Sequence, residues 1–169
     1  MPAEGQRAPA TGGTPPLHPD LVALAGLLGT WRGEGAGQYP TIAPFRYGEE
    51  ARFWHVGKPF FAYTQRTWSM DDGRPLHSET GYWRARPGGV VEVVLAHPTG
   101  IVEVLEGTVG AATIDLASIT VVGTSSAKEV SALRRHLRLA GDVLRYALSM
   151  AAVGEPLTPH LSAELHRVR

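Results

Sequence analysis

Cysteine is absent from the 169 residues of this chain. Its absence excludes a disulfide framework, a thiolate zinc site, an iron–sulfur cluster and a cysteine nucleophile, and it agrees with a reducing compartment. An excess of charge of one sign is also missing, because 16 Lys and Arg residues balance 16 Asp and Glu residues. This balance argues against a nucleic-acid partner, since proteins that bind the phosphate backbone normally carry a basic surface.

Long apolar runs are missing as well, and the apolar stretches fall far below the ~20 residues that a bilayer-spanning helix needs. The segment 1–16 reads MPAEGQRAPATGGTPP and lacks the apolar run of a signal peptide. We therefore expect residues 1–16 to form a disordered, Pro- and Gly-rich tail on a cytoplasmic protein that has no membrane partner.

Hydrophobic residues make up 43% of the chain, which is too much for a disordered protein and enough for a folded core. One short helix is predicted directly after Pro19, where Leu21, Leu24 and Leu28 recur at helical spacing. Gly29 ends this pattern. The length suits one domain, which we expect to cover residues 17–169.

Beyond Gly29, segments of strand composition alternate with turn clusters such as Asp71-Asp72-Gly73 and Pro87-Gly88-Gly89. The turns recur at intervals of roughly 8–12 residues, and several are short enough to join neighbouring strands as hairpins. The predicted strands cover residues 29–37, 45–56, 59–69, 76–84, 90–97, 100–108, 112–121, 128–139, 143–152 and 161–168. This pattern predicts an all-β, antiparallel protein.

Most of these segments have one apolar face. In the segment 90–97, for example, Val91, Val93 and Leu95 share a face with His97. Such faces need a closed interior, because one open sheet would leave unpaired edges and bare apolar surface. About ten strands close into a barrel that is wider than side chains alone can fill, so we expect an internal ligand cavity.

The first strand is rich in glycine, with Gly29, Gly33, Gly35 and Gly37 at a period of two and Trp31 in phase with them. The spacing fits neither a dinucleotide-binding turn nor a P-loop. Glycines on one face of a strand allow a flat ligand or another backbone to approach closely, or they allow the strand to bend at a barrel corner. The residues alone leave these readings open.

The same segment resembles the sequence motif of a known protein family. The motif Gly29-x-Trp31-x-Gly33-x-Gly35, followed by Gly37-x-Tyr39-Pro40, is similar to that of the nitrobindin family of haem-binding β-barrels. Further blocks that share this similarity are Phe45-x-Tyr47-x-Glu49-Glu50, Gly57-Lys58-Pro59-Phe60, Leu76-His77-Ser78-Glu79-x-Gly81-Tyr82, Leu95-Ala96-His97-Pro98-Thr99-Gly100, Ala127-Lys128-Glu129-Val130 and Pro156-Leu157-x-x-His160-Leu161. The resemblance covers about residues 17–169.

The resemblance implies a ten-stranded antiparallel up-and-down β-barrel with a short N-terminal helix and one haem b per subunit. It also implies an enzyme whose ferric form isomerises peroxynitrite to nitrate and whose ferrous form binds nitric oxide. Small molecules are then the expected ligands, and a homodimer is the expected assembly. No general base is required for this chemistry, so we interpret the acidic pairs Glu49-Glu50 and Asp71-Asp72 as surface and turn residues.

Seven histidines are candidate axial ligands, because haem needs a neutral imidazole in an apolar cavity and cysteine is absent. His136 and His166 each share a strand face with charged residues, which favours solvent-facing positions. His18 precedes the helix, so we expect it at the helix entry. His160 follows Pro159 directly before an apolar strand, where either a ligand or a surface histidine is possible. The resemblance assigns the axial ligand to His160.

The resemblance also implies further haem contacts. It places His77 and His97 in the blocks that line the pocket, and it gives Lys128 a haem contact where propionates need a cation. Met150 shares the inward face of its strand and is a further candidate for the pocket wall. Thr41 follows the Tyr39-Pro40 pair and is a candidate for the distal side of the iron.

The sequence is also compatible with two other functions. The same pocket would serve a nitric oxide carrier or sensor with little turnover. A lone Gly-x-Trp motif also opens lipocalin-type barrels, so a haem-free carrier of a small apolar ligand is the second alternative.

Overall fold

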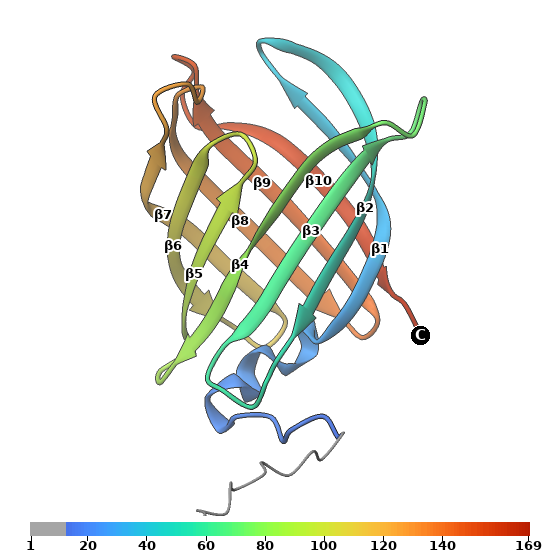
Figure 1. Ribbon diagram of the computed structural model, residues 1–169, viewed down its shortest axis with the longest axis vertical. Helices are drawn as coiled ribbons and strands as arrows, with labels where there is room; N and C mark the ends of the chain where they lie inside the picture. Colours follow the sequence, from blue (N-terminus) through green and yellow to red (C-terminus); the bar gives the residue numbers. More distant parts are fainter. Residues whose placement is uncertain (1–12) are drawn as a thin grey trace, which may run out of the picture.

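The computed structural model describes residues 13–169, so most of the predicted tail lies outside the described residues. Within these residues a single 3₁₀ helix precedes ten strands (Figure 1). In chain order the elements are η1 (Pro19–Leu27), β1 (Gly29–Tyr39), β2 (Ile42–Trp54), β3 (Phe61–Ser69), β4 (Pro75–Arg86), β5 (Val90–His97), β6 (Ile101–Val109), β7 (Thr113–Gly123), β8 (Val130–Ala140), β9 (Val143–Ala152) and β10 (Thr158–Arg167).

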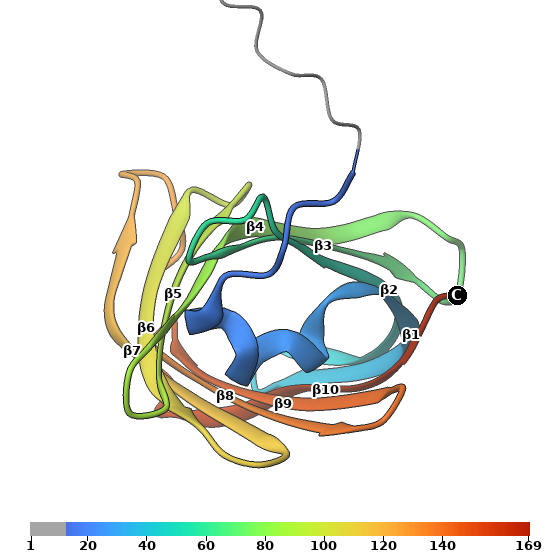
Figure 2. The same ribbon diagram turned by 90° about the horizontal axis from the view of Figure 1, so that it is seen from below.

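Each strand pairs antiparallel with its neighbours in the sequence, and β1 also pairs with β10, which closes the barrel. This arrangement confirms the predicted ten-stranded up-and-down barrel. Figure 2 shows the strands as a ring with η1 lying across one end. Among residues 13–169, no helix is long and apolar enough to cross a membrane.

The helix η1 closes the lower end of the barrel in Figure 1. His18 caps it, because its Nδ1 accepts a hydrogen bond of 3.3 Å from the backbone N–H of Asp20. Leu21, Leu24 and Leu27 are buried in the hydrophobic core that fills this end. The predicted helix is therefore confirmed with a 3₁₀ geometry, and His18 lies at its entry as expected.

Trp31 joins the helix to the barrel wall. The indole Nε1–H of Trp31 donates a hydrogen bond of 2.8 Å to the carbonyl of Leu27. The guanidinium of Arg167 lies over the indole ring, 4.2 Å from its centroid, and donates to the carbonyls of Gly26 and Leu28. These contacts satisfy carbonyls at the end of η1 and leave the opposite end of the barrel as the route to the interior.

The glycines of β1 make room for neighbouring protein atoms. A Cβ atom at Gly33 would lie 2.0 Å from a backbone carbonyl oxygen of β10, so the two strands approach too closely for any side chain. At Gly35 and Gly37 the space is taken by the rings of Tyr47 and Phe45, their partners on β2. The sequence left open whether these glycines admit a flat ligand, another backbone or a bend in the strand. The structure shows another backbone and two aromatic rings lying against them.

Candidate functional site

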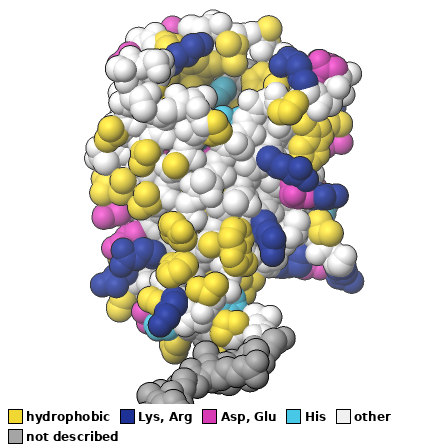
Figure 3. Space-filling view, in the orientation of Figure 1, with side chains coloured by type: hydrophobic (Ala, Val, Ile, Leu, Met, Phe, Trp, Pro, Cys, Tyr) yellow, Lys and Arg dark blue, Asp and Glu magenta, His cyan; other side chains and the backbone are white. Residues whose placement is uncertain are grey.

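The barrel encloses a cavity of about 940 Å³, which confirms the predicted internal cavity. Loops between β1 and β2, β3 and β4, β7 and β8, and β9 and β10 line it, so it opens at the end opposite η1. Figure 3 shows hydrophobic side chains and a histidine around a hollow at this upper end. All six residues that the sequence predicted as haem contacts line the cavity, namely Thr41, His77, His97, Lys128, Met150 and His160.

His160 lies inside β10, at a β-bulge. The register between β10 and β9 shifts between Pro159 and Leu161, so His160 is the extra residue on its strand. Bulges turn a side chain out of the regular alternation and are frequent beside functional sites. The strand therefore begins at Thr158, three residues before the predicted start at 161, because the bulge and Pro159 hide its pattern in the sequence.

The imidazole of His160 is fixed in one tautomer. Its Nδ1–H donates a hydrogen bond of 2.9 Å to the backbone carbonyl of Gln38. The edge-on ring of Tyr39 packs against it, with the ring centroids 5.2 Å apart. A carbonyl partner on one ring nitrogen orients the ring and leaves the other nitrogen, Nε2, with its lone pair free for a metal ion. Metal-ligating histidines typically have such an acceptor on the nitrogen that does not bind the metal.

Tyr39 joins β1 to β9 at the mouth of the cavity. Its hydroxyl accepts a hydrogen bond of 3.0 Å from the N–H of Ala152 and donates one of 3.1 Å to the carbonyl of Met150. The next residue, Val153, has a φ of 49°, which is a strained conformation for a β-branched residue. The turn that follows β9 is thereby held against β1, next to His160.

The remaining predicted contacts lie around the same mouth. Thr41 is exposed in the turn between β1 and β2, and Met150 is half-buried on β9. Lys128 is exposed in the loop before β8, which begins at Val130 rather than at 128 as predicted. The lysine is therefore positioned by a loop at the rim.

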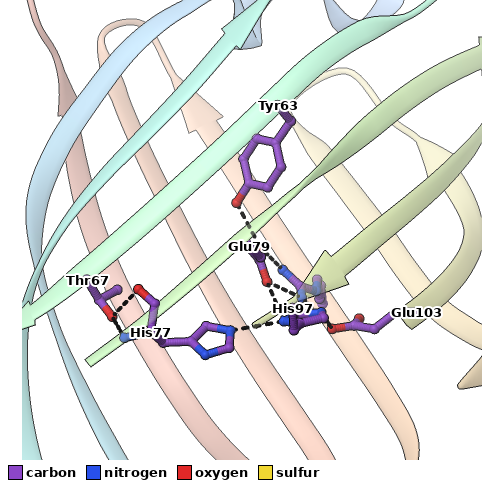
Figure 4. A network of polar contacts seen from close by, with 7 residues as sticks. Tyr63, Thr67, His77, Glu79, His97 and Glu103 are labelled. Atoms are coloured by element: carbon purple, nitrogen blue, oxygen red, sulfur yellow. Dashed lines mark hydrogen bonds and ion pairs between the residues drawn. The ribbon is translucent and has the colours of Figure 1, made fainter. Parts of the chain in front are cut away.

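His77 and His97 lie deeper and contact each other. His77 Nε2 and His97 Nδ1 are 2.9 Å apart, and Figure 4 shows the two rings side by side. The backbone of His77 pairs with the hydroxyl of Thr67, which accepts from the N–H at 3.0 Å and donates to the carbonyl at 3.2 Å. This exchange occurs where the register of β3 and β4 shifts, so a second bulge positions a second histidine.

Two buried carboxylates and a guanidinium surround these imidazoles. Arg135 donates to Glu79 through two hydrogen bonds of 2.7 and 2.9 Å, and to Glu103 through one of 2.9 Å. The hydroxyl of Tyr63 donates to Glu79 at 2.8 Å. His97 Nδ1 lies 3.7 Å from Glu79, and its Nε2 lies 2.6 Å from Glu103. We call these six residues, His77 included, the inner polar cluster.

Electrostatics within the inner polar cluster keep one carboxylate charged. Burial opposes ionisation of Glu79, but the charge and hydrogen bonds of Arg135 outweigh it and lower the pKa of Glu79 to about 2. Burial also lowers the pKa of His77, which favours a neutral imidazole with a free lone pair. The cavity floor is therefore polar and charged, although its outer walls are largely apolar.

A second buried carboxylate contradicts the prediction that Glu49 is a surface residue. Glu49 is 2% exposed and accepts a hydrogen bond of 2.6 Å from the hydroxyl of Tyr146. Burial raises the pKa of Glu49 to about 7. The prediction was wrong because Glu49 and Glu50 are adjacent but point to opposite faces of β2, and only Glu50 reaches the outer arginines, Arg32 and Arg66.

The comparisons with known proteins now identify the family. Residues 20–167 match the model of the THAP4-like, haem-binding β-barrel domain. The chain belongs to this family. It is 55% identical over 157 residues to peroxynitrite isomerase 1 of Mycolicibacterium paratuberculosis, a match covering 90% of this chain and 98% of that protein.

Two further relatives of the haem-binding β-barrel family agree with this assignment. The peroxynitrite isomerase of Nocardia farcinica is 55% identical over 155 residues, covering 89% of this chain and 92% of that protein. The crystal structure of Rv2717c from M. tuberculosis superposes with a TM-score of 0.86 at 53% identity and covers 91% of this chain and 100% of that one. The predicted family and fold are both confirmed.

The cavity of this family member fits a haem group. The iron needs an imidazole nitrogen at an apolar wall, and His160 offers Nε2 while its Nδ1 is engaged by Gln38. The propionates need a donor or cation at a wet rim, and Lys128 is exposed there. The donor chemistry of the mouth thus matches both ends of the cofactor.

The other histidines behave as the sequence predicted. His136 is exposed on the outer face of β8, with Nδ1 2.6 Å from Asp115. His166 is exposed on β10, with Nε2 3.0 Å from Glu164. Neither lines the cavity.

Sequence reasoning missed Glu79, Glu103 and Arg135 as cavity residues. One signal was present, because Arg135 shares the parity of Leu133 and Leu137, both of which point inward. The neighbouring Arg134 and Arg138 concealed it by giving the segment the composition of a solvated face.

Proposed function

We propose that this protein is a haem-dependent peroxynitrite isomerase that converts peroxynitrite to nitrate at one ferric haem b per subunit. The observation that carries the proposal is His160, a cavity-lining histidine at a bulge whose tautomer a backbone carbonyl fixes. The relatives named peroxynitrite isomerase, at 55% identity over nearly their whole length, support the same reaction.

When bound, ferric haem would supply a Lewis-acidic iron for the conversion of peroxynitrite to nitrate. The chain supplies the rest. His160 Nε2 would bind the iron, and the Gln38 carbonyl, which accepts from Nδ1–H, would make that imidazole a more basic ligand. Lys128 would pair with a propionate at the rim, and Thr41 and Met150 line the mouth. His77 and His97 line the inner side of the pocket.

Binding of nitric oxide by the ferrous form is the second candidate function. The same free nitrogen of His160 and the same cavity would serve a carrier or sensor. The lipocalin-like alternative has lost its support, because the family model describes a haem-binding domain. The homodimer and the cytoplasmic location stay predictions.

Stopped-flow mixing of peroxynitrite with the ferric haem-loaded protein tests the proposal. We expect faster decay than in buffer, together with a higher yield of nitrate relative to nitrite. His160→Ala should remove the acceleration, whereas the exposed control His136→Ala should retain it. Unchanged decay with the loaded wild-type protein contradicts the isomerase function and leaves nitric oxide binding as the role of the pocket.

A further inference from the structure

We propose that the inner polar cluster holds a divalent first-row transition metal ion through His77, Glu79 and His97, at a site separate from the axial histidine. This inference goes beyond the proposed function and does not require it. One imidazole nitrogen of each histidine and one carboxylate oxygen of Glu79 all lie within 4.8 Å of one another (Figure 4).

The distances from His97 Nδ1 to the other two donors fit one ion. Metal–ligand bonds of about 2.0–2.2 Å place two donors of the same ion roughly 3–4 Å apart. His77 Nε2 and His97 Nδ1 are 2.9 Å apart, and His97 Nδ1 is 3.7 Å from Glu79 Oε2. Two imidazoles and one carboxylate are the ligand set of catalytic zinc sites and of non-haem Fe(II) sites, and this set leaves coordination positions open.

The other ring nitrogen of His97, Nε2, lies beside a carboxylate, as is common in metal-bound histidines. His97 Nε2 lies 2.6 Å from a carboxylate oxygen of Glu103, which is 1% exposed. A carboxylate on the far nitrogen fixes the tautomer and turns the lone pair of Nδ1 toward the metal. Once a metal ion fixes the ring, Glu103 would take the role at His97 that the Gln38 carbonyl takes at His160.

Unpartnered polar atoms point to a missing ligand at this place. Within residues 13–169, His97 Nε2 is buried without an aligned hydrogen bond, although Oε1 of Glu103 lies 2.6 Å from it, and the other oxygen of Glu103, Oε2, is also buried without a partner. Buried polar atoms without partners are costly and need a specific explanation. An ion on His97 Nδ1 would hold the ring so that Nε2–H donates to Oε1 of Glu103, which gives the ring nitrogen a partner.

The charges leave room for a cation. Glu79 and Glu103 carry two formal negative charges, and Arg135 supplies one positive charge to them. One negative charge is left facing the two imidazoles. Arg135 occupies only one of the two lone pairs of Glu79 Oε2, so this oxygen keeps a second lone pair for a metal.

The open positions of the ion would face the cavity, because all three ligands line it. The pocket would then contain two metal centres, the haem iron on His160 near the mouth and a second ion on the floor. The ligand class for this second site is Zn²⁺, Fe²⁺ or Co²⁺, since imidazole and carboxylate donors suit these ions.

Titration of the haem-free full chain with Co²⁺, followed by its visible absorption bands, tests the site. We expect one Co²⁺ per chain and bands typical of a four- or five-coordinate ion with nitrogen and oxygen ligands. His97→Gln should abolish them, and Glu103→Gln should weaken binding about 10–100-fold. The controls His160→Ala and His136→Gln should bind Co²⁺ as the wild type does.

A measurement on the wild-type protein covers the case in which a cluster variant fails to fold. Zinc should shift the ¹⁵N resonances of His77 Nε2 and His97 Nδ1 and leave those of His136 and His160 unchanged. The proposal is overturned if no saturable binding occurs, or if the shifts appear at His160 instead. Neither result bears on haem binding, so failure here and failure of the proposed function are distinguishable.

Discussion

Replacement of Arg135 by methionine should strongly destabilise the fold. Arg135 is the guanidinium that pairs with both buried carboxylates of the inner polar cluster, through three hydrogen bonds of 2.7–2.9 Å. Methionine is similar in length but carries no charge, so Glu79 and Glu103 would lose the cation that pairs with both of them. Removal of one partner from a buried ion pair typically costs about 3–5 kcal/mol.

The pKa of Glu79 gives a second route to the same magnitude. Its lowering from 4.5 to about 2 corresponds to roughly 3 kcal/mol of preferential stabilisation of the carboxylate form. Because the folded-state pKa is the lower one, this stability is present above pH ~4.5 and is lost as the pH falls toward 2. Arg135→Met should remove both the stability at pH 7 and this part of the acid dependence.

Urea unfolding followed by far-UV circular dichroism measures the effect. We expect the Arg135→Met midpoint to fall by an amount equivalent to about 3 kcal/mol or more at pH 7, with an unchanged slope. Arg134→Met is the matched control, because Arg134 is the exposed neighbour on the same strand and should change stability by less than about 0.5 kcal/mol. A loss below ~1 kcal/mol in Arg135→Met would refute the reasoning that Arg135 neutralises this cluster.

Three further variants test other parts of the structure. The raised folded-state pKa of Glu49 means that the wild type loses folding stability as the pH rises from 4.5 to 7, and Glu49→Gln should remove this loss. At pH 8 the variant should therefore be more stable than the wild type by about 3 kcal/mol in urea unfolding. No gain in stability at pH 8 would contradict the burial of the charge. Gly33→Ala should lower the free energy of unfolding by at least about 1–3 kcal/mol, because the new Cβ would lie 2.0 Å from a backbone oxygen that cannot move alone. A thermal melt measures this loss, and an unchanged melting temperature would show that the two strands can separate. Lys128→Ala should weaken hemin binding only about 1.4–5-fold, because an exposed ion pair contributes about 0.2–1 kcal/mol. Lys58 is the other lysine of the chain, and Lys58→Ala should leave hemin binding unchanged. Equal effects of the two substitutions would argue against a contact between Lys128 and a propionate.

The barrel was predictable because its determinants are local. Turn clusters between alternating segments are visible within a few residues of sequence, and each strand pairs with the next one along the chain. The errors lie where a bulge interrupts the alternation, as at His160, which the sequence placed before a strand and the structure places within it. A bulge adds one residue without a sequence signal strong enough to locate it.

The mouth of the site was predictable from the motif blocks, but the floor was not. Glu79, Glu103 and Arg135 lie on β4, β6 and β8, and only the closed register of the barrel brings them together. Charged residues on strands are usually solvated, so reasoning that treats each strand alone assigns them to the surface. Glu49 shows the same effect, because its burial depends on the tyrosine that β9 places against it.

Titration of the haem-free protein with hemin, followed by the Soret absorption band, tests the central claim that His160 holds haem in this cavity. We expect saturation at one hemin per chain, with a shifted Soret band and a spectrum of histidine-ligated ferric iron. In His160→Ala that spectrum should be lost, and in His136→Ala it should be preserved. Binding with an unchanged iron spectrum in His160→Ala would contradict the assignment of the axial ligand and the function built on it.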